Sequence, residues 1–178
     1  DPAIPASGVA VREGLPAPNV MVDVREAAVR AGIAEIGYCG EILTPWFGPR
    51  QRFQLILTDA PLTPTPMLET PVCDRCGACA ASCPLGAFKG EHQVTIAGKT
   101  MTVADVDANV CRTCGNGARP NSDHPAGKPD RLGALCVRSC VHHLDEVGAI
   151  KNIIDSPFRK RPAWSRDANG AIHLTDEG

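Results

Sequence analysis

This chain has few aromatic residues, a small net charge and no long hydrophobic run. Only 4% of its 178 residues are aromatic, which leaves too few rings to build a stacking surface for single-stranded nucleic acid. The formal net charge is −2, so the chain lacks the excess of positive charge that binds polyanions. No segment approaches the ~18 consecutive apolar residues that a membrane helix needs. We therefore expect no nucleic acid among its partners and no membrane span.

Proline and the spacing of apolar residues divide the chain into four predicted parts. Residues 21–36 place apolar side chains at helical spacing, and residues 52–58 alternate as a strand does. Four prolines between residues 60 and 71 exclude a continuous helix or a central strand there. The predicted parts are a partial α/β segment over 1–62, a proline-rich linker over 63–72, a cysteine-rich domain over 73–155 and a polar tail over 156–178.

The cysteine-rich part carries the main functional signal of the sequence, because eight of the nine cysteines lie in it. The first four of these eight form the run C-x2-C-x2-C-x3-C-P, which binds clusters in bacterial ferredoxins. Two-residue gaps turn successive thiolates inward around one cubane, while the fourth cysteine faces away and reaches another cluster. The run consists of Cys73, Cys76, Cys79 and Cys83, followed by Pro84.

A second cysteine set repeats this pattern with a long insert. Cys111 and Cys114 form C-x-x-C-G, and Cys136 and Cys140 form C-x3-C. The Gly after the second cysteine and the Ser before the fourth recur in both sets, but 21 residues separate Cys114 from Cys136 where the first set has two. Residues 92–103 predict a β-hairpin between the two sets, and residues 132–147 predict a helix.

The repeat predicts two 4Fe–4S clusters with crossed ligation. One cluster takes Cys73, Cys76, Cys79 and Cys140, and the other takes Cys111, Cys114, Cys136 and Cys83. The predicted fold class is therefore α+β, with a small partial α/β segment followed by a bacterial-ferredoxin-like two-cluster domain that has a long insert in its second half. Structural zinc is the alternative, although three cysteines at two-residue gaps crowd a single tetrahedral ion. Disulfides between cysteines so close in sequence would be strained.

The remaining candidate ligands are one cysteine and three histidines. Cys39 is interpreted either as a buried thiol or as a residue near a substrate or cofactor. His124, His142 and His143 are predicted to be non-ligands, since adjacent residues on a helix cannot both face one cluster.

Several short motifs precede the cysteine run in a specific order. They are Ala31-Gly32, Glu35-Ile36-Gly37, Gly40, Leu43-Thr44-Pro45, Phe47-Gly48-Pro49-Arg50 and Leu57-Thr58-Asp59-Ala60-Pro61-Leu62. This order resembles the epoxyqueuosine reductase and reductive dehalogenase group over roughly residues 22–140. The resemblance implies the C-terminal part of a cobalamin-binding domain, followed by a two-cluster domain that feeds electrons to a cobalt centre.

The resemblance also implies a set of further site residues. Gly37, Gly40, Gly48 and Arg50 would contact cobalamin, and Tyr38, Cys39 and Asp23 are candidate catalytic residues, with Tyr38 as a proton donor. An ordinary packed tyrosine and simple turns at the glycines are the alternatives. About 30 residues precede this region, too few for a complete corrin pocket, so we expect the active site to lie mostly elsewhere.

The predicted function is electron transfer through two 4Fe–4S clusters to a reductase active site, as a component of an oxidoreductase. The alternatives are a cobalamin-dependent reductase that acts itself and a zinc-stabilised interaction domain. The expected partner is a redox protein or a catalytic subunit. The expected location is a reducing cytoplasm, because exposed cubanes need protection from oxidants.

Overall fold

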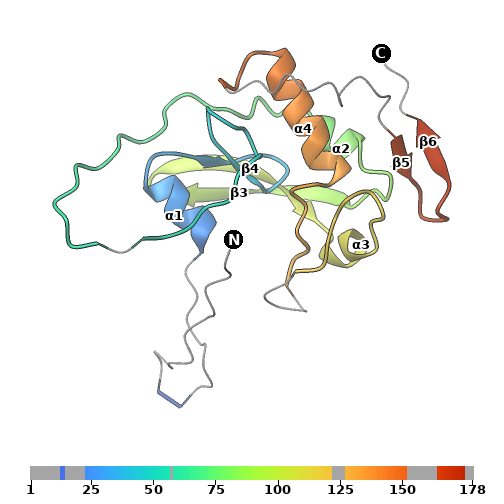
Figure 1. Ribbon diagram of the computed structural model, residues 1–178, viewed down its shortest axis with the longest axis horizontal. Helices are drawn as coiled ribbons and strands as arrows, with labels where there is room; N and C mark the ends of the chain where they lie inside the picture. The colour runs from blue at the N-terminus through green and yellow to red at the C-terminus, as the bar shows by residue number, and fades with distance from the viewer. Residues whose placement is uncertain (1–12, 15–22, 57, 122–126, 152–163, 175–178) are drawn as a thin grey trace.

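Short helices and two-stranded antiparallel sheets make up the regular structure of the chain (Figure 1). The computed structural model describes residues 13–14, 23–56, 58–121, 127–151 and 164–174. The helices are α1 (Val24–Arg30), α2 (Ala78–Ala81), α3 (Ala108–Arg112) and α4 (Leu135–Glu146). The strands are β1 (Glu35–Ile36), β2 (Ile42–Leu43), β3 (Phe88–Ile96), β4 (Lys99–Val106), β5 (Trp164–Arg166) and β6 (Ile172–Leu174). The expected mixture of α and β structure is confirmed.

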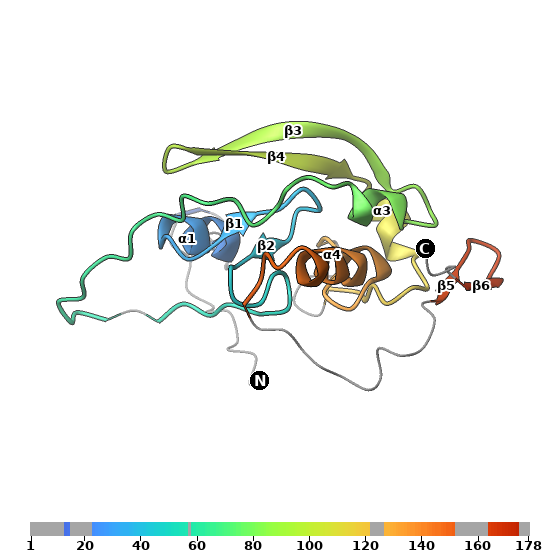
Figure 2. The ribbon, with the colours of Figure 1, turned by 90° about the horizontal axis from the view of Figure 1, so that it is seen from above.

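The hairpin of β3 and β4 is the longest sheet among the described residues. Its register pairs Ile96 with Lys99 across a turn at Ala97 and Gly98, both of which have positive φ. The hairpin predicted over 92–103 is confirmed and is longer than expected. Figure 2 shows the hairpin lying over α1, β1 and β2, and residues of β3 and β4 share a small apolar cluster with Val29 of α1.

Helix α1 is shorter than the helix predicted over 21–36, and the prediction was wrong over residues 31–36. The Asp23 side chain caps the helix by accepting from the amides of Arg25 and Glu26, and the helix ends at Arg30. Gly32 then has φ +77°, and a Cβ there would lie 2.4 Å from the carbonyl oxygen of Pro66. The proline-rich segment therefore folds back against the end of α1 and stops it.

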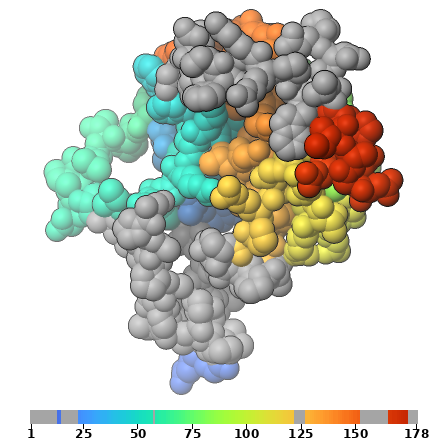
Figure 3. All heavy atoms as spheres, turned by 45° about the vertical axis from the view of Figure 1, so that its right-hand side comes forward, coloured from blue at the N-terminus to red at the C-terminus, as the bar shows by residue number. Residues whose placement is uncertain are grey.

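The strand predicted over 52–58 is wrong for the described residues, because 52–56 form no strand. Leu55 is 46% exposed and Ile56 is 87% exposed. A strand needs a neighbouring strand, and none of the described chain pairs with this segment. Figure 3 shows part of the segment between β2 and α2, coloured teal to green, projecting from the body of the molecule.

The polar tail predicted from residue 156 contains a β-hairpin that the sequence analysis did not predict. Strands β5 and β6 form an antiparallel hairpin, and Asp167 accepts from the amides of Asn169 and Ala171 to shape its turn. Asn116 binds the backbone of this hairpin at Arg166 through both its amide oxygen and its amide nitrogen. The rest of the predicted tail lies outside the described residues.

The main core joins the N-terminal and cysteine-rich parts of the chain. Leu43, Val72, Val137, Leu144 and Ile150 pack together, each at most 4% exposed. Cysteines form much of the remainder of this core, namely Cys39, Cys79, Cys136 and Cys140. The helix predicted over 132–147 is confirmed as α4, which supplies the largest share of these residues. None of the described helices is long and apolar enough to cross a membrane. The division of the chain at residues 62, 72 and 155 stays a prediction.

Candidate metal centres

The cysteines of the two predicted ligand sets line two separate cavities. The first cavity is lined by Cys73, Cys76, Cys79 and Cys140, with Tyr38, Cys39 and His143 beside them. The second cavity is lined by Cys83, Cys111, Cys114 and Cys136, with Phe88, Arg131 and Leu135 beside them. The first cavity thus carries five thiols, with Cys39 as the fifth, and the second carries four, which is the number that ligates a 4Fe–4S cluster.

The first cavity is built by the loop that follows the buried Val72. Arg75 has φ +60° and Gly77 has φ +80°, so the chain turns sharply between successive cysteines before α2 begins. Helix α2 then buries Cys79. On the opposite side, the backbone amide of Tyr38 donates to the Cys73 sulfur at 3.4 Å. An amide aimed at a thiolate sulfur stabilises the negative charge of a bound cluster.

The second cavity is built from α3 and the beginning of the insert. Asp107 caps α3 by accepting from the amides of Asn109 and Val110, and this fixes the helix that carries Cys111. The amide of Asn116 donates to the Cys114 sulfur at 3.4 Å. The amide of Ala87 donates to the Cys83 sulfur at the same distance. The second cavity therefore has the same kind of amide-to-sulfur contact as the first.

Two short segments each send one cysteine to each cavity. On α4, Cys136 lines the second cavity and Cys140 the first, and four helical residues span about 6 Å along the axis. Cys79 on α2 and Cys83 just after it make the same division. Helices α2 and α4 pack against each other, as Figure 1 shows near its top. Cys83 of the first set thus lies with the cysteines of the second cavity, and Cys140 of the second set lies with those of the first. Ligation of two clusters in this crossed pattern stays a prediction.

Burial keeps most of these thiols protonated when no metal is bound. It raises the pKa of Cys136 to about 11, and it also raises the pKa values of Cys73, Cys76 and Cys111. A buried thiolate is costly without a positive partner, and a bound metal centre supplies that partner. The residues therefore fit a metal cluster better than an array of bare thiolates.

Cys39 lies against the first cavity and is 1% exposed. Hydrogen bonds with the thiols of Cys140 and Cys79 hold its pKa well below the usual range. The expectation of a buried thiol is confirmed. Its place beside the first cavity also agrees with the second interpretation, a residue near a cofactor. Beside it, burial and the charge of Glu91 raise the pKa of Tyr38.

A second group of possible ligands lies at the mouth of the first cavity. His143 Nε2 lies 2.6 Å from Asp74 Oδ2, and these two side chains and Cys76 bring their ligand atoms within 4.8 Å of one another. Such a mixed set suits zinc rather than a cluster. Because Cys76 is shared with the first cavity, the two arrangements compete. His142 lies on the exposed side of α4, paired with Glu146, and His124 lies outside the described residues.

The residues that the resemblance assigned to cobalamin do not converge on one cavity. A Cβ at Gly37 would meet Leu43 at 2.5 Å, and one at Gly48 would meet Leu144 at 3.2 Å, so both glycines pack against the core. Arg50 is held in an ion pair with Asp145 of α4 at 3.5 Å.

Gly40, the fourth of these residues, lies elsewhere, as does the catalytic candidate Asp23. Gly40 and Asp23 line a pocket of about 570 Å³ beneath the β3–β4 hairpin. Because the four residues that the resemblance assigned to cobalamin are dispersed in this way, no step is assigned to cobalamin.

The sequence analysis assigned no role to three side chains that lie near the cavities. Asn116 is 2% exposed, Glu35 is 3% exposed, and Arg131 lines the second cavity. Asn116 and Arg131 lie in the insert, whose Gly, Pro, Asn and Asp content predicts a loop but no contacts. Glu35 belonged to a motif of the resemblance, which assigned it no role. Contacts between distant segments give these residues their places.

Comparison with known proteins supports the resemblance over part of the chain. The tetrachloroethene reductive dehalogenase of Sulfurospirillum multivorans is 37% identical over 64 residues, which are 34% of this chain and 13% of that protein. Those of Desulfitobacterium hafniense and Dehalobacter restrictus are 39% identical over 67 residues, which are 36% of this chain and 12% of each relative. The chain is partly homologous to tetrachloroethene reductive dehalogenases.

This homology is limited in extent. The chain covers 12–13% of the length of these relatives. No family model matches the chain, and no solved structure matches it. The predicted resemblance to the reductive dehalogenase group is confirmed for about a third of the chain.

Proposed function

We propose that this chain holds two 4Fe–4S clusters and passes electrons through them to a reductase active site. The first cluster is ligated by Cys73, Cys76, Cys79 and Cys140, and the second by Cys83, Cys111, Cys114 and Cys136. The observation that carries the proposal is that the four proposed ligands of each cluster line one cavity, with Cys39 as an additional cysteine at the first. The spacing C-x2-C-x2-C-x3-C-P independently supports clusters over zinc.

The chain's own residues have three tasks in this proposal. Their thiolates hold the irons, and the amides of Tyr38, Ala87 and Asn116 stabilise charge at the sulfurs. Apolar side chains such as Leu144 and Leu135 line the cavities and limit water. A bound cluster supplies one-electron transfer at a potential that these contacts adjust.

The partner in the proposed function is the catalytic part of a larger reductase. The relatives are reductive dehalogenases of tetrachloroethene, and a reductive dehalogenation consumes electrons. A matched share of about an eighth of each relative leaves most of such an enzyme outside this chain. We therefore propose that the electrons pass to a carbon–halogen reductase centre in another segment or subunit. A cytoplasmic location stays a prediction.

Anaerobic purification with metal analysis tests this proposal. Iron, sulfide, zinc and cobalt are counted on one sample, and the dithionite-reduced protein is measured by EPR. About eight irons and eight sulfides, with spectral broadening from two neighbouring reduced clusters, are the expected result. Stoichiometric zinc in a colourless protein would contradict the proposal and support a zinc-stabilised interaction domain. Stoichiometric cobalt with iron would instead support a cobalamin-dependent reductase that acts itself.

A further inference from the structure

Arg131 lines the second cavity, and its Nη2 contacts residues beside the first. Nη2 donates to the carbonyl oxygen of Cys39 at 2.6 Å and lies 2.9 Å from Glu41 Oε1. The Arg131 side chain is 11% exposed. Because Cys39 borders the first cavity, these contacts anchor the guanidinium on the side of the first cluster.

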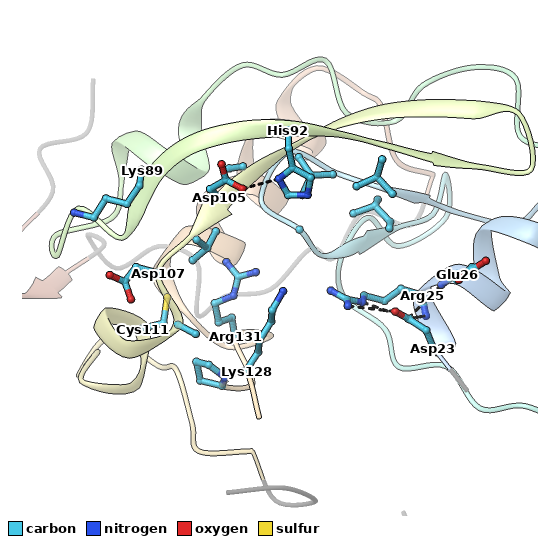
Figure 4. Close-up of a pocket in the computed structure, with 18 of the residues that line it drawn as sticks. Asp23, Arg25, Glu26, Lys89, His92, Asp105, Asp107, Cys111, Lys128 and Arg131 are labelled. Carbon is cyan, nitrogen blue, oxygen red and sulfur yellow. Dashed lines mark hydrogen bonds and ion pairs between the residues drawn. The ribbon is translucent and has the colours of Figure 1, made fainter. Parts of the chain in front are cut away.

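The other end of the guanidinium has an unused donor. Arg131 Nη1 is buried and has no hydrogen-bond partner among the described residues. Arg131 lines the second cavity together with Cys111 and Cys136, and it also lines the pocket beneath the β3–β4 hairpin. Figure 4 shows Arg131, Lys128 and Cys111 on the wall of that pocket. A buried donor of this kind needs an acceptor, and the cluster sulfurs of the second cavity would provide one.

The charges around Arg131 agree with this orientation. Burial opposes its charged form, but Glu41 raises its pKa, and so do Cys136, Cys39 and Cys111 when they are deprotonated, as cluster ligands are. In return, Arg131 acts to lower the pKa values of Cys136 and Cys111, against the larger effect of burial. The guanidinium is thus a buried cation in the lining of the second cavity, beside the cysteines proposed to hold the second cluster.

We propose that Arg131 raises the reduction potential of the second cluster by donating from Nη1 to one of its sulfurs. Reduction adds one negative charge to the cluster, and a fixed cation with a charge-assisted hydrogen bond stabilises the reduced form more than the oxidised form. A higher potential at the second cluster favours electron transfer from the first cluster to the second. This inference rests on the proposed function, because it requires a cluster in the second cavity.

An EPR-monitored redox titration of the anaerobically reconstituted chain tests the inference. Arg131→Gln removes the charge and replaces the guanidinium with a shorter, neutral amide, and it is expected to disfavour reduction of the second cluster by at least tenfold, equal to about 59 mV for one electron. Arg131→Lys keeps the charge and is expected to shift the potential less. Replacing Glu41 as well, in Arg131→Gln/Glu41→Gln, keeps the net charge of the pair unchanged and should still lower the potential.

A matched control separates a local effect from a general loss of charge. Arg52 forms an exposed ion pair with Asp130, beside Arg131 in sequence, and it lines neither cavity. Arg52→Gln removes the same charge and is expected to leave both potentials in place. Two redox transitions are expected in the titration, one for each cluster. Cys76→Ser should change the EPR signal of the first cluster only, so the transition that it leaves unchanged belongs to the second cluster.

The outcomes distinguish this inference from the proposed function. Full iron content with equal potentials in Arg131→Gln and Arg52→Gln would overturn the inference and leave the two-cluster function standing. Loss of the second cluster in both Arg131→Gln and Arg131→Lys would also overturn it, because Arg131 would then be needed for assembly. Failure of the unaltered chain to bind iron would contradict the proposed function itself.

Discussion

The buried carboxylate of Glu35 accepts a hydrogen bond of 2.7 Å from the backbone amide of Cys73. The same oxygen accepts from the Val72 amide at 2.8 Å, and the other oxygen lies 2.9 Å from the ammonium of Lys99. Lys99 belongs to β4 and also donates to the Leu68 carbonyl at 2.8 Å. One side chain on β1 thereby ties the start of the cysteine run to the hairpin that covers it.

Removal of Glu35 is expected to destabilise the chain strongly. Glu35→Ala leaves two buried amides and the Lys99 ammonium without their partner, and breaking a buried ion pair in this way costs about 3–5 kcal/mol. The free energy of unfolding, measured by urea titration under anaerobic conditions, checks the value. Glu26→Ala is the control, since its ion pair with Arg30 is exposed and should contribute less than about 1 kcal/mol. Equal effects of the two substitutions would contradict the anchoring role.

The crossed ligation predicts how cysteine substitutions combine. Cys83→Ser is expected to lose the second cluster, about half the iron, although Cys83 belongs to the first run in sequence. Adding Cys114→Ser should cause no further loss, because both cysteines line the second cavity. Adding Cys76→Ser to Cys83→Ser should remove nearly all the iron, because Cys76 lines the first cavity. If Cys83→Ser with Cys76→Ser retained half the iron, both would ligate one cluster and the assignment would be wrong.

Cys39 is expected to be dispensable for cluster binding. The other four cysteines of the first cavity already complete a ligand set, so Cys39→Ala should retain all the iron. Because Cys39 lines the first cavity beside Cys79 and Cys140, its removal should alter the EPR line shape of the first cluster and leave that of the second unchanged. Iron and sulfide analysis together with EPR make the comparison. A loss of about four irons would make Cys39 a ligand and require a different set.

Asp23 is expected to act as a helix cap rather than as a catalytic residue. Asp23→Ala removes the acceptor for two amides at the start of α1 and should cost about 1 kcal/mol of stability. Asp23→Asn keeps a good capping side chain and should cost much less. Urea unfolding measures both, and the rate of cluster reduction should be the same in both variants. A rate that fell in Asp23→Asn at unchanged stability would favour a chemical role.

Local patterns predicted some elements well and others poorly. The alternation around Gly98 and the apolar spacing of α4 predicted elements that the structure contains, because each pattern buries one face of its own segment. The alternation over 52–58 failed because no described strand pairs with it. The helix predicted over 21–36 was too long because a carbonyl of Pro66 approaches Gly32, a contact between residues distant in sequence.

The sequence by itself determined the chemistry of the candidate centres. Thiols at gaps of two and three residues, repeated in two sets, define which atoms can bind metal, since ligand type and short spacing are local properties. Tertiary structure alone decided the surroundings. Glu35 meets Cys73 across 38 residues and Arg131 meets Cys39 across 92, contacts that no local pattern encodes. Packing of the separate segments into one core creates these contacts, because it excludes water and leaves each buried polar group to find a partner within the protein.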